Sequence, residues 1–260
     1  MITSAIFSIT LLQSSAHALS CMEGIYQTNV TSQGQVLPVN AQVVVWSAYS
    51  DPAEPLNYLV NTDTGEDLPM ISTYIQSDAY GVAPEQGFQS GSSYNIVTRH
   101  SDADEEVHAQ FSIGEDVDEV APEVPVVMDV ERTIEEDSWG ESVSLQITLQ
   151  PRSEDSLHYL VEVADNEEFE NSSAALVFAY GDVLYVGTDP CTTTVPGDVV
   201  RSAKFVRVRT IDIAGNQSDF SSDFALEPTS DVASCSSAQV DIYGWAGLFG
   251  LAMIGMRRKW

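Results

Sequence analysis

Between residues 22 and 228, short runs rich in Val, Ile, Thr and Tyr alternate with turns rich in Gly, Pro, Asn and Asp, at intervals of roughly ten residues. No convincing helical period of apolar residues interrupts this pattern. The clearest run is residues 142–149, in which Val143, Leu145, Ile147 and Leu149 alternate with polar residues and are predicted to share one inward face. The pattern predicts an all-β fold built from two β-sandwiches.

Each half of this region supplies its own set of strands. In the first half the predicted strands are residues 41–47, 56–60, 70–75, 94–98 and 107–113. Trp46 is expected in the core, and one face of the last strand is expected to carry Val107, Ala109, Phe111 and Ile113. In the second half the predicted strands are residues 142–149, 157–164, 174–180 and a run that starts at Phe205.

An acidic segment divides the two halves. Residues 115–123 read EDVDEVAPE, and like charges with prolines favour an extended, semi-rigid linker. The predicted organisation is a signal peptide (1–18), a first sandwich (19–113), a linker (114–124), a second sandwich (125–228) and a C-terminal segment (229–260).

Three stretches resemble known extracellular modules. The run QVLPVNAQV (residues 35–43) and the run FQSGSSY (residues 88–94) resemble bacterial Ig-like domains, and the resemblance implies that the Tyr94 hydroxyl bonds to upstream backbone as a tyrosine corner. The run FVRVRTIDIAGNQS (residues 205–218) resembles the end of a fibronectin type III or related Ig-like domain, with Thr210 where an alanine is common. These resemblances imply sandwiches and no particular activity.

The N-terminus predicts export. Residues 2–12 are apolar, and Ala16, His17 and Ala18 form a small-x-small site, so a signal helix is expected to be cleaved after Ala18. The alternative is a lipoprotein signal that ends in Cys21, although a lipobox has Leu where this chain has Ala18.

The C-terminus predicts attachment to the cell surface. The apolar stretch 242–256 forms a helix of roughly 22 Å, shorter than a hydrocarbon core of about 30 Å. Cys235, a spacer, this helix and the basic residues Arg257, Arg258 and Lys259 resemble a MYXO-CTERM sorting tag, which implies cleavage near the cysteine. The alternative is a short anchor with the basic residues on the cytoplasmic side. Both place an exported protein in the cell envelope, attached to the membrane through this segment or through its processed product.

The charge limits the possible partners. The chain has 39 acidic and 10 basic residues and a net charge of −29, with the acidity spread over both halves. Nucleic acid is excluded as a partner because no basic face could neutralise phosphates. The carboxylates either form a solvated acidic surface or collect Ca²⁺.

Several residues are weak calcium candidates. Asp212, Asn216 and Asp219 lie in the last turn, where Asp212 is otherwise expected to cap its own turn by an Asx hydrogen bond. Two further acidic turns are candidates, one with Asn61, Asp63 and Asp67, and one at residues 102–106.

Cysteine and histidine spacing is uninformative about chemistry. Cys21, Cys191 and Cys235 permit disulfides after export, and tag processing at Cys235 would leave Cys21 and Cys191, whose pairing stays open. No C-x-x-C favours a zinc or redox site. His100 and His108 are placed on facing strands of a hairpin, without an evident third ligand.

No catalytic motif is present, so no enzyme activity and no cofactor are predicted. The leading hypothesis is a non-enzymatic cell-surface protein that presents Ig-like modules for adhesion, interaction or envelope structure, with an unknown protein or glycan as partner. The alternative is a calcium- or carbohydrate-binding accessory module, which exposed aromatic residues would favour; a secreted hydrolase is a remote third.

Basic residues of the second half allow two interpretations. They are Arg201, Lys204, Arg207 and Arg209, and they form either an anion site or cross-strand ion pairs, for instance with Glu162. Val206 and Val208 are expected to face the core, which leaves Arg207 and Arg209 on the outer face.

Overall fold

The computed structural model describes residues 24–227, apart from residues 32, 49–50, 54–55, 77, 102–103, 138–139, 152–157 and 189–192. The described residues up to Leu226 belong to one compact unit. The predicted signal segment with Ala18, the three cysteines and the C-terminal segment with Arg257, Arg258 and Lys259 lie outside the described residues, so their processing stays a prediction.

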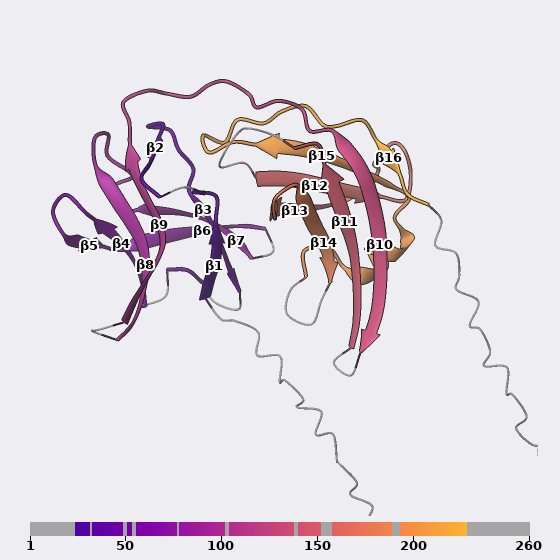
Figure 1. Ribbon diagram of the computed structural model, residues 1–260, viewed down its shortest axis with the longest axis horizontal. Helices are drawn as coiled ribbons and strands as arrows, with labels where there is room; N and C mark the ends of the chain where they lie inside the picture. Colours follow the sequence, from indigo (N-terminus) through magenta and orange to yellow (C-terminus); the bar gives the residue numbers. More distant parts are fainter. Residues whose placement is uncertain are drawn as a thin grey trace, which may run out of the picture. The chain divides into compact units, whose positions relative to one another are not determined.

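The N-terminal half forms a first sheet pair (Figure 1). One sheet has the order β1-β3-β7-β6 and the other the order β2-β9-β8-β4-β5. The strands are β1 (Gly24–Thr28), β2 (Gln35–Leu37), β3 (Val44–Ala48), β4 (Asn57–Asn61), β5 (Glu66–Leu68), β6 (Met70–Gln76), β7 (Ala79–Pro84), β8 (Ser93–Ser101) and β9 (Asp104–Ile113). Strands within each sheet pair antiparallel, except β2 and β9, which are parallel. Apolar residues of both sheets form one core, as expected for a β-sandwich.

Tyr94 makes the hydrogen bond that its sequence context predicts. It is buried at the start of β8, and its hydroxyl accepts a hydrogen bond from the Gln89 backbone N–H at 3.0 Å. The Tyr94 ring also packs against Phe88 and Phe111. The bond therefore fixes the turn before β8 to the first core.

The prediction that Val107 faces the core is wrong. Ala109, Phe111 and Ile113 are buried as expected, but Val107 is 44% exposed. Ile96 pairs with Ala109 and Val97 pairs with Val107, so His108 is an extra residue in β9. This β-bulge reverses the alternation of faces for the residues that precede it.

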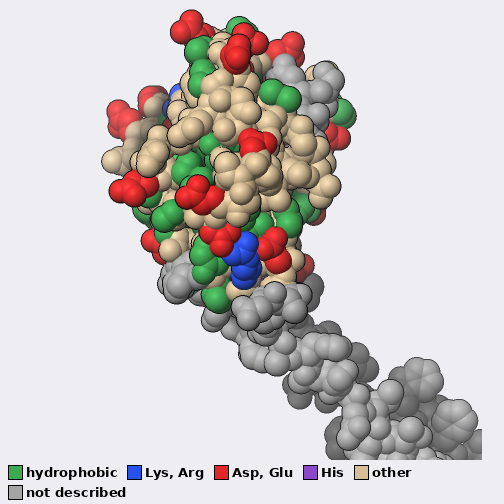
Figure 2. Space-filling view, turned by 90° about the vertical axis from the view of Figure 1, so that its left-hand side faces the viewer, with side chains coloured by type: hydrophobic (Ala, Val, Ile, Leu, Met, Phe, Trp, Pro, Cys, Tyr) green, Lys and Arg blue, Asp and Glu red, His purple; other side chains and the backbone are tan. Residues whose placement is uncertain are grey.

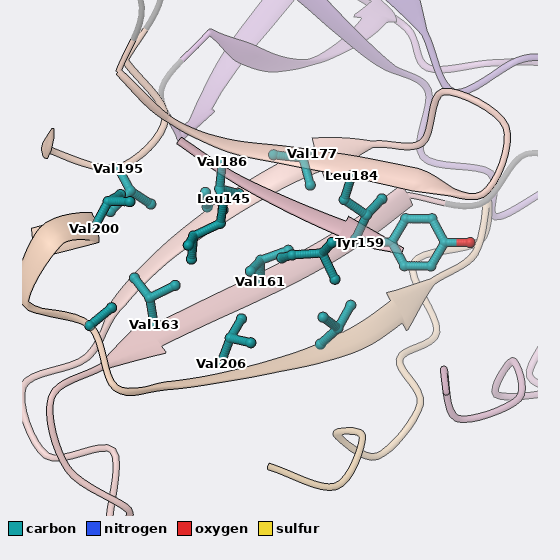
Figure 3. Close-up of a cluster of buried hydrophobic side chains, with 14 of the residues drawn as sticks. Leu145, Tyr159, Val161, Val163, Val177, Leu184, Val186, Val195, Val200 and Val206 are labelled. Carbon is teal, nitrogen blue, oxygen red and sulfur yellow. The ribbon is translucent and has the colours of Figure 1, made fainter. Parts of the chain in front are cut away.

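The C-terminal half forms a second sheet pair, with the orders β10-β11-β14 and β13-β12-β15-β16. The strands are β10 (Val127–Asp137), β11 (Gly140–Leu149), β12 (His158–Ala164), β13 (Ser173–Phe178), β14 (Val183–Thr188), β15 (Phe205–Ile211) and β16 (Phe224–Ala225). The predicted inward residues of β11 and the valines of β15 are buried in one core between these sheets (Figure 3). The two-layer architecture predicted for this half is confirmed at the level of β-sheets.

One short helix was not predicted. Helix α1 (Gly197–Ser202) begins after Pro196 and buries Val200 in the second core. Six residues are too few to show a helical period in the sequence. Among the described residues, no helix has the length and hydropathy needed to cross a membrane.

The two sheet pairs share a third apolar cluster. Val44, Trp46 and Ala79 from the first pair pack with Leu176 and Ile211 from the second. Trp46 is 1% exposed, which confirms its predicted burial, and its indole N–H donates to the Leu176 carbonyl at 3.3 Å. Trp46 thus joins the two halves of the unit.

The acidic segment after β9 is hydrogen-bonded to both halves of the unit. Residues 114–126 have no regular secondary structure, in accord with an extended linker. The Asp118 carbonyl accepts hydrogen bonds from the side-chain amides of Asn40 at 2.8 Å and Asn216 at 3.1 Å. One residue of the linker is therefore bonded to both halves.

Candidate functional site

A pocket of about 360 Å³ lies where the two sheet pairs meet. Its aromatic lining residues are Tyr26 and Trp46 from the first pair, and Phe178, Tyr180 and Tyr185 from the second. Its polar lining residues are Asp78, Ser142, Ser144, Thr188 and Thr194. This volume lies near the lower end of the range for small-molecule sites.

Strand alternation brings the aromatic rings to this place. In β13, Ala175 and Val177 point into the second core, so Leu176 and Phe178 point outward. Tyr180 lies just before the turn that leads into β14, and Tyr185 lies within β14.

The rings form a chain of edge contacts. Trp46 and Phe178 lie 5.2 Å apart with an interplanar angle of 67°, and Phe178 and Tyr180 lie 4.6 Å apart at 64°. Tyr185 extends the chain from Tyr180 at 6.2 Å, and Tyr26 contacts Phe178 at 6.2 Å. Tyr180 is 60% exposed and Tyr185 is 47% exposed, so the outer rings are open to a ligand.

Asp78 supplies a carboxylate to the pocket. It precedes β7, and its carbonyl accepts a hydrogen bond from the Ser47 N–H at 2.8 Å. The Tyr26 hydroxyl donates to its Oδ2 atom. Burial raises the pKa of Tyr180, and the nearby Asp78 charge raises it further. The negative charge of Asp78 therefore acts on Tyr180, which is an exposed residue of the pocket.

Other polar groups of the pocket are engaged within the fold. The Thr188 hydroxyl donates to the Val195 carbonyl at 3.0 Å, and the Thr194 hydroxyl donates to the Gly187 carbonyl at 3.2 Å. Gly187 has φ of 148°, and a Cβ there would lie 2.1 Å from the Val143 carbonyl oxygen. Only glycine permits β14 to approach β11 so closely at this wall.

His158 lies behind the aromatic cluster. It is 3% exposed, its ring lies 6.1 Å from Trp46, and its Nδ1 atom has no hydrogen-bond partner among the described residues. Burial lowers the pKa of His158 to about 4, so the imidazole is neutral at pH 7.

The calcium candidates of the last turn have other roles in the structure. The Asp212 Oδ1 atom accepts hydrogen bonds from the N–H groups of Ala214 at 2.9 Å and Asn216 at 2.8 Å, which is the predicted Asx-type turn. Asp212 Oδ2 accepts from the Asn216 side chain at 3.0 Å, whereas the Asp219 side chain is exposed. The neighbouring Ile213 packs into the first core, so the turn helps to join the two halves.

The turn with Asn61, Asp63 and Asp67 is engaged in hydrogen bonds and an ion pair, whereas residues 102–103 of the other acidic turn lie outside the described residues. Asn61 Oδ1 accepts from the Asp63 and Thr64 N–H groups, and Asp63 Oδ2 accepts from the Ser93 N–H at 2.9 Å. Asp67 forms an ion pair with Arg99, and this hydrogen bond lowers the pKa of the carboxyl group.

His100 and His108 do lie on paired strands, β8 and β9, as predicted. Glu106 lies between them, with its two oxygens each 3.9 Å from a ring nitrogen. Over the part of the chain that the structure describes, no group of three His, Cys, Asp or Glu side chains could hold a metal ion.

Arg207 of β15 forms the predicted cross-strand ion pair with Glu162 of β12. Arg207 donates two hydrogen bonds to Glu162 Oε2, at 2.8 and 2.6 Å. Its guanidinium also lies 4.0 Å from the Phe169 ring centroid and 4.3 Å from that of Phe220. The Arg209 guanidinium also lies over the Phe220 ring, 3.6 Å from its centroid. Arg201 forms an ion pair with Glu141.

Apart from Trp46, which was expected in the core, the sequence did not single out the pocket residues. Asp78 lies in a short turn, and Tyr180 and Tyr185 follow strand patterns that any surface tyrosine could share. A run of aromatic residues at positions 178, 180 and 185 was the available signal.

The described residues form a mostly β-strand fold with four sheets and an aromatic pocket that both halves line. The sequence matches no family model and no curated protein.

Proposed function

We propose that this chain is an exported, non-enzymatic binding protein of the cell envelope. Two β-sandwich modules, one Ig-like and one fibronectin type III-like, are held together and bind a small ligand where they meet. The hydrogen bond to the Tyr94 hydroxyl supports the Ig-like assignment of the first module. The turn that Asp212 forms with the following residues Ala214, Gly215 and Asn216 supports the fibronectin type III-like assignment of the second. The apolar ends of the sequence support export and surface attachment.

The observation that carries the proposal is the pocket with exposed tyrosines. Concave sites with mostly apolar walls and a few polar groups are the usual form of small-ligand sites. Among the described lining residues, Asp78 is the one acid and there is no histidine or cysteine. This composition favours binding over acid–base or nucleophilic catalysis.

Thermal unfolding of the full chain tests the proposal. The panel contains neutral saccharides, organic ammonium compounds and Ca²⁺, each at increasing concentration. A binding ligand is expected to raise the melting temperature in proportion to the logarithm of its concentration above Kd. Tyr180→Ala is expected to remove that shift.

Tyr74→Ala is the matched control, because Tyr74 is equally exposed on β6 and lies outside the pocket. A shift that survives in Tyr180→Ala but not in Tyr74→Ala would contradict the proposed site. The absence of any shift across the panel would contradict the proposed binding function.

Carbohydrate is the second candidate ligand class. The exposed rings of Tyr180 and Tyr185 favour it, because a sugar ring can pack its apolar face on an aromatic ring. The saccharide arm of the same panel tests this candidate.

A further inference from the structure

We infer that the pocket binds the ammonium group of a small, soluble organic cation. The inference rests on the proposed binding function and names the ligand chemistry of that site. Three observations carry it: the mutual inclination of the rings, the charge at the pocket and the engagement of three of its hydrogen-bond donors within the fold.

The rings form inclined walls instead of a flat platform. Consecutive rings from Tyr26 through Phe178 and Tyr180 to Tyr185 are inclined at 59°, 64° and 66°. A sugar ring packs best on one flat face, whereas a cation is attracted to several ring faces that surround it. Inclined tyrosine and phenylalanine rings therefore favour a compact cation.

The electrostatics point the same way. Asp78 places a carboxylate in the lining, and its charge acts on Tyr180. The protein as a whole carries a net charge of −29. On the face shown in Figure 2, Asp and Glu side chains are scattered widely and few Lys or Arg side chains are visible. This field attracts a cation and repels an anion.

Three hydrogen-bond donors of the pocket are already used within the fold. The Trp46 N–H, the Thr188 hydroxyl and the Thr194 hydroxyl each donate to backbone carbonyls. The described lining contains no Asn, Gln, Arg or Lys side chain to bind sugar hydroxyls. An ammonium group needs ring faces and a negative charge, and the pocket supplies both.

The size of the pocket limits the ligand to a small molecule. A volume of about 360 Å³ accommodates a compact head group and a short chain. We therefore assign the site to a soluble ammonium compound and not to a lipid surface, which the acidic protein would approach poorly when the lipid is anionic.

Calorimetric titration of the full chain tests the inference with choline chloride as the probe. The neutral comparison is 3,3-dimethylbutan-1-ol, which has the shape of choline without its charge. Choline is expected to bind at least about tenfold more tightly than this alcohol, because cation–π attraction and the Asp78 charge act on the cation alone.

Two variants locate the effect. Asp78→Asn is expected to weaken choline binding about tenfold and to leave binding of the alcohol unchanged, whereas Asp223→Asn removes the same charge from an exposed site outside the pocket and is expected to change little. Tyr185→Ala is expected to weaken choline binding with only a small change in the melting temperature, because Tyr185 is 47% exposed.

The outcomes separate the inference from the proposed function. Equal binding of choline and the alcohol, or choline binding that Asp78→Asn leaves intact, would overturn the ammonium assignment. Saccharide binding that requires Tyr180 would overturn it too, and would keep the binding function. Binding to phosphatidylcholine vesicles without binding to free choline would overturn the soluble source. If none of these probes binds, the inference and the proposed function both fail.

Discussion

The two ends of one sheet surface contrast sharply. On the outer face of the β13-β12-β15-β16 sheet, His158, Phe178 and Ile211 occupy one row, and Trp46 packs against that end. Four residues further along the strands, Glu162 pairs with Arg207. The first end is apolar and mostly buried, whereas the second is charged and partly open to solvent.

The contrast shows that covering by another module decides the chemistry of a sheet face. At the covered end His158 is 3% exposed and neutral at pH 7, and it lies among apolar side chains. At the open end Arg207 lies against the ring of Phe169 and Arg209 lies against the ring of Phe220. We therefore expect large, pH-dependent effects at the covered end and small, salt-dependent effects at the open end.

Trp46→Ala is expected to have the largest effect. Removal of this buried ring leaves a cavity between the two halves and should lower the free energy of unfolding by about 3–5 kcal/mol. Urea denaturation measures the loss, and Trp46→Phe is the control that keeps a ring. A loss below about 1 kcal/mol would show that Trp46 does not close this end.

The next effect is a pH dependence at His158. Its pKa is lowered from 6.5 to about 4 in the folded chain, so the unfolded chain binds the proton more tightly. Stability is therefore complete above pH 6.5 and is lost as the pH falls towards 4, by about 3 kcal/mol.

Denaturation at several pH values measures this loss. His158→Phe is expected to remove most of the dependence. Burial also lowers the pKa of His108, and this group adds a dependence of the same sign that the variant retains. An unchanged slope in His158→Phe would assign the whole effect to His108 and other groups.

Arg207→Ala tests the open end. It removes a cross-strand ion pair and two ring contacts, and a loss of about 1–2 kcal/mol is expected. Arg207→Lys keeps the charge but not the planar stacking, so it should restore only part of the stability. A double-mutant cycle with Glu162→Ala, repeated in 1 M salt, separates the ion pair from the stacking.

Arg209→Ala is expected to have the smallest effect, about 0.5 kcal/mol. The side chain stacks on Phe220 and donates one hydrogen bond to Gln217 at 2.9 Å, both at a partly exposed site. Thermal unfolding measures the change. A loss as large as that of Trp46→Ala would abolish the contrast between the two ends.

Much of the strand pattern could be predicted because alternation has a short period. The inward residues of β11 and the valines of β15 follow directly from polar and apolar residues in turn. Tyr94 followed from a local turn, since its hydroxyl reaches a residue only five positions upstream. The bulge at His108 could not be predicted, because one unpaired residue leaves no mark on composition.

The pocket could not be predicted from such patterns. Tyr26, Asp78 and Tyr180 are far apart in the chain and meet because two sheet pairs pack together. Alternation marks which side chains face their own core, but it does not show which outer faces another module will cover.

The sequence by itself indicated nine of the sixteen strands that the structure describes, most of their inward faces and the acidic character of the chain. Each of these depends on residues close together in the chain or on composition. Only the tertiary structure decided that Trp46 and His158 become buried neighbours and that tyrosines from distant strands enclose one pocket. The physical reason is that these contacts form only when whole sheets pack against each other to bury apolar surface. The periodicity of residues along one strand contains no information about that packing.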